Sequence, residues 1–86
     1  MIIGVAVIEK DVMICLPKPN RHHHCIRYAV RVLGLTPPIA GPAKNQGFYL
    51  ADGTYLEREE ALVYAKKHDQ LINKEAHAYL FSEDLW

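Results

Sequence analysis

The N-terminal stretch IIGVAVIEKDVMICL constrains the fold more than any other part of this chain. Two apolar runs flank a short polar turn at Glu9, Lys10 and Asp11, and this pattern predicts a β-hairpin. Both runs are continuous rather than alternating, which indicates strands that are covered on both faces. Pro17 and Pro19 are expected to end the second strand, because proline has no N–H to donate to a sheet.

A helix and a proline-rich loop follow this hairpin. Asn20 is the expected N-cap of the helix, apolar residues then repeat at helical spacing, and Gly34 is placed to end it. The next stretch, LTPPIAGPAKN, contains three prolines and a glycine. It is predicted to be a loop without an element of its own.

The second half of the chain repeats the ββα order. Asp52-Gly53 between two β-prone runs predicts another hairpin, and a second helix starts near Arg58. The tail AHAYLFSEDLW is too apolar to stay in water, so we expect it to dock. Residues 1–86 are therefore predicted to form a single α+β domain of two ββα units and an apolar tail, and to be oligomeric.

The net charge of zero conceals an uneven distribution of charge. No acidic residue lies between Asp11 and Asp52, and most acidic residues follow that span. The span instead carries these basic residues and histidines: Lys18, Arg21, His22, His23, His24, Arg27, Arg31 and Lys44. One half of the chain can therefore attract anions, although a hydrophobic share of 50% and a charged share of 23% are those of an ordinary globular protein.

The expected location is the cytoplasm. No apolar run approaches the roughly 18 residues of a membrane span, and the N-terminal stretch lacks the basic region and cleavage site of a signal peptide. Cys15 and Cys25 do not have the spacing of a disulfide framework, which agrees with a reducing compartment.

The first turn of the first helix has the wrong charge. Arg21, His22, His23 and His24 crowd a position where the helix dipole is positive and favours acidic side chains. The free N–H groups and the positive dipole of a helix N-terminus bind phosphate or carboxylate, and a bound anion would make these side chains favourable. Arg27 lies one turn further along on the same stripe as His23.

Three other readings of the histidines remain open. They can be neutral, solvated surface residues. They can bind zinc, but distant ligands would have to converge and no C-x-x-C or H-x-x-x-H pair supports this. His22 or His23 can act as a general acid or base, but the basic half holds no carboxylate to orient either ring. Binding without turnover fits the residues better.

The second hairpin carries further candidates for a nucleotide site. Phe48 and Tyr49 lie on opposite faces of a strand, so one can stack on a base while the other packs inward. Gln46 can contact a base edge or a ribose. Arg58 can join the site if the first helix lies close by. The alternative is a core aromatic and a surface arginine.

Three segments carry a resemblance to a known group of proteins. They are RHHHCI, QGFYLADGTYLEREEALVYA and the closing LFSEDLW. The arrangement resembles a widespread group of small bacteriophage and prophage proteins with the pattern basic-His-His, Gln-Gly-Phe, Arg-Glu-Glu-Ala and C-terminal Ser-Glu-Asp-Leu-Trp. The chain departs from this pattern in the proline-rich loop and at His24, where an acid is expected.

The resemblance implies evasion of host immunity. Some small phage proteins are sponges, which are oligomers that sequester a nucleotide signal, a cyclic oligonucleotide or an ADP-ribose derivative, without hydrolysing it. The ligand-binding positions that it carries over are Arg21, His22, His23, Gln46, Phe48 and Arg58, and helical spacing adds Arg27. A small chain encloses a ligand more easily with a second subunit, so we expect at least a dimer, with no cofactor and no enzymatic activity.

Two other functions stay open. The chain can be a small interaction module that contacts a host protein or nucleic acid through Arg27 and Arg31 of the first helix. Its neutral net charge argues against nucleic acid, because dedicated binders are usually strongly basic. A histidine-dependent nucleotide phosphodiesterase is the least favoured of the three.

Overall fold

A four-stranded antiparallel sheet organises the chain. The computed structural model describes residues 1–86 and places the strands in the order β2-β1-β3-β4. The strands are β1 (Ile2–Glu9), β2 (Val12–Pro17), β3 (Gln46–Leu50) and β4 (Tyr55–Glu57). Each hairpin joins neighbouring strands, and β1 pairs with β3 in the middle of the sheet. Both predicted hairpins are confirmed.

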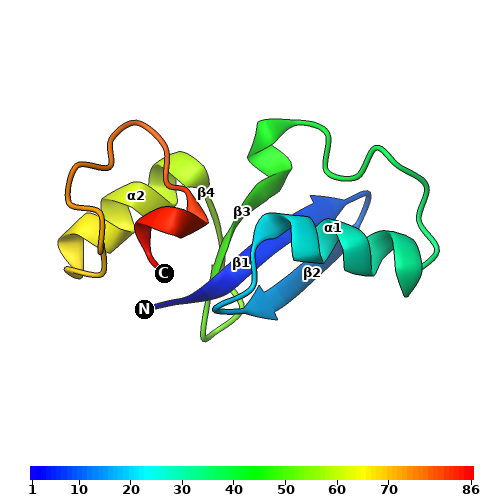
Figure 1. The fold of residues 1–86 in the computed structure, drawn as a ribbon, viewed down its shortest axis with the longest axis horizontal. Helices are drawn as coiled ribbons and strands as arrows, with labels where there is room; N and C mark the ends of the chain where they lie inside the picture. Colours follow the sequence, from blue (N-terminus) through cyan, green and yellow to red (C-terminus); the bar gives the residue numbers. More distant parts are fainter.

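A helix follows each hairpin, as predicted. Helix α1 (His22–Arg31) follows β2, and α2 (Arg58–Lys67) follows β4 (Figure 1). The fold is therefore α+β with two ββα units. The proline-rich loop is less featureless than expected, because it contains a 3₁₀ turn, η1 (Ala43–Asn45), and buries Ile39 and Ala40 in the core.

The hydrophobic core lies on one face of the sheet. Cross-strand partners point to the same face, and the pairs Val5–Phe48 and Val7–Ile14 are all buried there. Helix α1 covers this face with Cys25 and Ala29. Helix α2 adds Ala61, Leu62 and Ala65 to the same core.

Neither helix packs on the opposite face of the sheet. The expectation that both faces are covered was therefore wrong. The apolar side chains of this face, in register across the strands, are Ala6, Ile8, Met13, Cys15, Tyr49 and Tyr55. None of them belongs to the core cluster or to the partly buried residues packed against it. The strands therefore carry apolar side chains on both faces, and the two helices bury only those on one face.

Helix α1 begins one residue later than predicted. Arg21, not Asn20, is the N-cap residue, and the Asn20 side-chain amide instead donates a hydrogen bond to the Pro17 carbonyl at 2.8 Å. At the other end, the Leu35 N–H donates to the Ala29 carbonyl at 3.0 Å. Gly34 lies inside this closing turn with a φ of 69°, a left-handed conformation that favours glycine, so its predicted role is confirmed.

The C-terminal tail docks on its own domain, as its apolar content predicted. It runs back over α2 and ends in a second 3₁₀ turn, η2 (Ser82–Asp84) (Figure 1). Leu80 and Leu85 are buried in the common core. The Asp84 carbonyl accepts hydrogen bonds from the Ile72 and Asn73 N–H groups, so the tail is folded on itself as well.

Candidate functional site

The N-termini of the two helices lie next to the same pocket. In Figure 1, α1 and α2 both begin near the centre of the molecule and run away from it in opposite directions, with η2 between them. A pocket of about 380 Å³ opens there. It is lined by Arg21, His22, His23, Arg58, Phe81, Ser82 and Glu83. Four of these were predicted to be ligand-binding positions, and the structure brings those four together.

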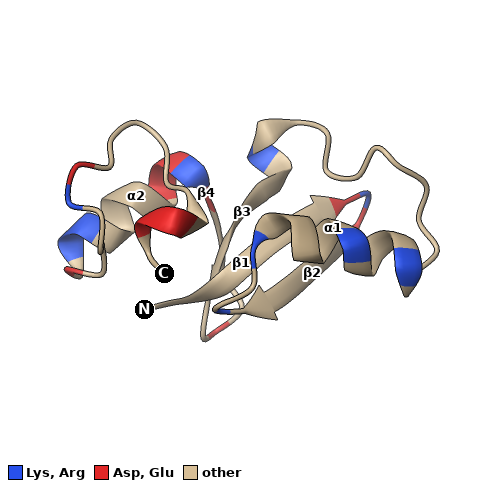
Figure 2. Cartoon of the chain, viewed as in Figure 1, with Lys and Arg blue, Asp and Glu red and all other residues tan.

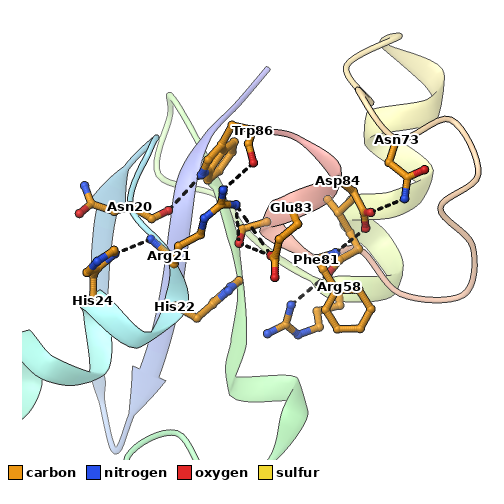
Figure 3. Close-up of polar contacts among 12 residues, drawn as sticks. Asn20, Arg21, His22, His24, Arg58, Asn73, Phe81, Glu83, Asp84 and Trp86 are labelled. Atoms are coloured by element: carbon orange, nitrogen blue, oxygen red, sulfur yellow. Dashed lines mark hydrogen bonds and ion pairs between the residues drawn. The ribbon is translucent and has the colours of Figure 1, made fainter.

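Arg21 joins the start of α1 to the tail. Its guanidinium donates hydrogen bonds to Ser82 Oγ at 3.0 Å and to the Trp86 main-chain oxygen at 2.7 Å (Figure 3). A carboxylate oxygen of Glu83 lies 3.8 Å from the same guanidinium. The Trp86 indole N–H returns a hydrogen bond to the Asn20 carbonyl at 3.1 Å. Arg21 therefore places a positive charge in the pocket and also holds the C-terminal tail against the start of α1.

Arg58 supplies the second positive charge. Its guanidinium donates to the Leu80 carbonyl at 3.0 Å and to Gln46 Oε1 at 3.3 Å, and it lies 5.2 Å from the centre of the Phe81 ring. Partial burial lowers its pKa, but a guanidinium stays protonated at any physiological pH. Gln46 does not line the pocket and contributes only by holding Arg58.

His22 is not a cation at neutral pH. Its ring is buried, its Nε2 lies 2.7 Å from the Gly47 carbonyl, and it contacts the Phe48 ring edge-on at 5.2 Å between centroids. Burial, opposed by the hydrogen bond to Gly47 and reinforced by the charge of Arg58, lowers its pKa to about 4. Since a carbonyl can only accept, Nε2 carries the proton and donates. His22 is a structural bridge between α1 and β3.

His24 explains much of the unusual first turn. Its Nδ1 accepts a hydrogen bond from the Arg21 N–H at 2.8 Å, which is the role that Glu60 plays for Glu57 at the start of α2. An accepting ring is neutral, and desolvation together with the charges of His23, Arg27 and Arg21 lowers the pKa of His24. The imidazole therefore caps the helix as an acid would. Of the three histidines, only His23 is exposed beside the pocket.

The capping role of His24 predicts the effect of a single substitution. His24→Glu is expected to raise the free energy of unfolding by about 0.5 to 1 kcal/mol, because a carboxylate at this position caps the Arg21 N–H and also complements the helix dipole. Urea unfolding at neutral pH measures the change. His23→Glu, one residue earlier, is the matched control, since its side chain caps nothing. An equal or smaller gain for His24→Glu than for this control would contradict the capping role.

Besides Gln46, two predicted ligand-binding residues do not line the pocket. Phe48 is 0% exposed in the core, so it offers no face to a ligand, and the predicted stacking role is wrong. Arg27 lines a separate groove on the outer side of α1 with Tyr28 and Arg31. Helical spacing put Arg27 on the stripe of His23, but the pocket faces the end of the helix rather than its side.

Sequence reasoning missed the contribution of η2. Phe81, Ser82 and Glu83 complete the pocket, and hydrogen bonding from Ser82 lowers the pKa of Glu83, which is ionised. The closing LFSEDLW was expected to dock and carried part of the resemblance, but none of its residues was expected to line a site. Asp84, the third residue of η2, accepts a hydrogen bond from the N–H of the N-cap residue Phe81 at 2.9 Å and thereby fixes the turn.

Other chemistries have less support in the structure. No three His, Cys, Asp or Glu side chains converge in a way that could hold a metal ion. Both cysteines are free, and burial raises the pKa of Cys25 to about 12, so it is not a ready nucleophile. Neither helix has the length and apolar character that a membrane span requires.

The fold and the pocket define a small α+β protein in which Arg21 and Arg58 line a pocket between two helix N-termini. The family described as the phage T4 y16D protein matches residues 1–86, and the chain belongs to this family. The resemblance to small phage proteins is thereby confirmed. Comparison with curated proteins and with solved structures gave no match.

Proposed function

We propose that this phage protein binds and sequesters a phosphate-containing nucleotide signal of the host without hydrolysing it. The observation that carries the proposal is the convergence of two guanidinium groups, Arg21 and Arg58, with exposed His23 at the N-termini of two helices. The unpaired N–H groups and the positive dipole end of α1 add to these charges, because its first turn carries no acidic residue. The first turn of α2, in contrast, already carries Glu59 and Glu60, and Figure 2 shows this acidic start in red. Phosphate is the ligand group that such an arrangement favours most.

The rest of the pocket suits the remainder of a nucleotide. Phe81 is half-exposed and has Arg58 against its ring, a pairing on which a base can stack. The carboxylate of Glu83 can accept hydrogen bonds from ribose hydroxyls. A volume of about 380 Å³ lies within the range of small-molecule sites. The ligand class is a cyclic oligonucleotide or an ADP-ribose derivative.

The histidines support binding rather than turnover. The Nε2–H of His22 is committed to the Gly47 carbonyl, and Nδ1 of His24 is committed to the Arg21 N–H. No carboxylate is hydrogen-bonded to the exposed His23 ring, so nothing orients it as a general base. Capture of the intact nucleotide is the activity that these groups favour, and a second subunit that closes over the ligand belongs to the same proposal.

The first experiment identifies what the protein retains. The protein is incubated with a panel of cyclic di- and trinucleotides and ADP-ribose derivatives, separated from free ligand, and denatured by heat. We expect one nucleotide to be released chemically intact. Release of a cleaved product would support the phosphodiesterase alternative, and retention of no member of the panel would contradict the proposal.

His23→Glu is the cleanest test of the pocket. Its side chain is exposed and makes no hydrogen bond, and its ring lies 4.1 Å from the His24 ring between centroids. The change adds a negative charge beside the pocket, so we expect affinity for the retained nucleotide to fall at least about tenfold. Arg31→Glu is the matched control, because it changes the charge of the same helix outside the pocket. Equal losses in the two variants would exclude His23 from the site. Arg21→Ala is less informative, since it also releases Ser82 and Trp86.

One observation favours a second candidate function. A groove of about 280 Å³ on the outer side of α1 holds Arg27, Tyr28 and Arg31, which can contact the phosphates of nucleic acid or an acidic host protein. Duplex binding that falls steeply with salt and is lost in a variant with both arginines replaced by alanine would support this function. Nucleotide retention unaffected by the same variant would keep the two functions separate.

A further inference from the structure

Arg58 is held by the tail through two hydrogen bonds to the same residue. Its main-chain carbonyl accepts from the Leu80 N–H at 3.0 Å, and its guanidinium donates to the Leu80 carbonyl at 3.0 Å. The Leu80 side chain is 0% exposed, whereas its neighbours Tyr79 and Phe81 are each 51% exposed. The tail therefore buries one side chain next to Arg58 and leaves an aromatic ring exposed on each side of it in the chain.

The two exposed rings line different pockets, and Arg58 lines both. Phe81 lines the pocket between the two helix N-termini, where its ring lies beside the Arg58 guanidinium (Figure 3). Tyr79 lines a second pocket of about 230 Å³, together with Arg58 and Lys44 of η1. The contacts of Arg58 with Leu80 and Gln46 use only part of its hydrogen-bond donors, so the remaining N–H groups can reach a ligand. One ligand can therefore extend from the first pocket into the second past this guanidinium.

The second pocket suits the uncharged part of a nucleotide. Glu57 and Glu59 line it as well as Lys44 and Arg58, so its formal charges cancel and it does not favour a second phosphate. Carboxylates accept hydrogen bonds from ribose hydroxyls and from the amino groups of bases. The exposed ring of Tyr79 offers a face on which a base can stack. The first pocket therefore favours the phosphate, and the second favours a nucleoside.

We propose that the captured ligand is a dinucleotide and that the pocket of Tyr79 holds its second nucleoside. This inference rests on the proposed function and narrows it. The phosphodiester contacts Arg21 and Arg58, one base stacks on Phe81, and the other base stacks on Tyr79. A ligand with a single base fills only the first pocket, whereas a dinucleotide fills both. The ligand class is therefore a dinucleotide rather than an ADP-ribose derivative.

Calorimetric titration with two probes of equal charge tests the inference. Adenylyl-adenosine (ApA) carries two nucleosides on one phosphodiester and cyclic AMP carries one, so a difference in affinity reports the second nucleoside. Wild type is expected to bind ApA at least about tenfold more tightly. Tyr79→Ala should remove this preference by weakening ApA alone, Tyr79→Phe should keep it because the ring stacks, and Phe81→Ala should weaken both probes. Tyr28→Ala is the matched control, since Tyr28 is 40% exposed on α1 and lines neither pocket.

The outcomes separate this inference from the proposed function. Equal affinity for the two probes, or a preference for ApA that survives Tyr79→Ala, would overturn the inference and leave the proposed function standing. Wild type that retains an ADP-ribose derivative but binds neither probe would do the same. An oligoadenylate strand that binds more than about a hundredfold more tightly than ApA would assign the two rings to single-stranded nucleic acid and overturn the inference. Only a protein that retains no nucleotide at all would overturn both.

Discussion

Phe48→Ala is expected to lower the free energy of unfolding by about 3 to 5 kcal/mol, which is the range for truncation of a buried aromatic side chain. The ring is 0% exposed and meets His22 edge-on at 5.2 Å and Trp86 at 6.5 Å between centroids. Its loss opens a cavity between β3, the start of α1 and the tail. A domain of this size is only marginally stable, so the variant is expected to unfold near room temperature.

Urea unfolding of both wild type and variant measures this effect, and Tyr49→Ala is the matched control. Tyr49 is the next residue of β3 but points to the uncovered face, so its truncation should cost much less, about 1 kcal/mol. If Phe48→Ala unfolded like wild type but failed to retain nucleotide, the ring would belong to the ligand site and its assignment to the core would be wrong.

Acidification is expected to remove about 2 kcal/mol of stability through His22 alone. The folded-state pKa of about 4 lies below the ordinary value of 6.5, so the unfolded chain binds the proton more tightly. The contribution of the neutral, hydrogen-bonded ring is complete above pH 6.5 and is lost progressively as the pH falls toward 4. The size follows from about 1.4 kcal/mol for each pKa unit, reduced because the ring is not completely enclosed.

The measurement compares unfolding free energies at neutral pH and near pH 4.5 in wild type and His22→Gln. Glutamine can donate to the Gly47 carbonyl but does not titrate, so the variant should lose less stability on acidification, by about 2 kcal/mol. Carboxylates titrate over the same interval in both proteins and cancel in the comparison. Identical pH profiles would show that His22 keeps an ordinary pKa in the folded state.

Local chemistry in the sequence was enough to predict the elements of the fold. Asp52-Gly53 between β-prone runs predicted the turn of the second hairpin, and Gly34 was placed correctly at the end of α1. The N-cap of α1 was assigned to Asn20 because its side chain is a good cap. That assignment failed because His24 caps the Arg21 N–H from within the first turn.

The candidate site was harder to predict because it depends on tertiary placement. Arg21 and Arg58 were found through their charge and their positions at helix starts. Strand alternation shows that Phe48 and Tyr49 lie on opposite faces but does not show which of them points into the core. Phe48 was assigned to the ligand, whereas in the structure it is the buried one. Phe81 and Glu83 were missed because nothing in the sequence says against which helix end a C-terminal tail docks.

The hydrogen bond between Arg21 and Ser82 suggests a way to detect ligand binding in the pocket. These residues are 61 positions apart in the chain, yet they are hydrogen-bonded to each other and both line the pocket. A molecule held there clamps the tail to the first ββα unit, so its binding energy opposes every opening of the domain that separates them. Slower proteolysis and slower amide exchange in the tail would then report the captured signal, even when that signal has no optical signature.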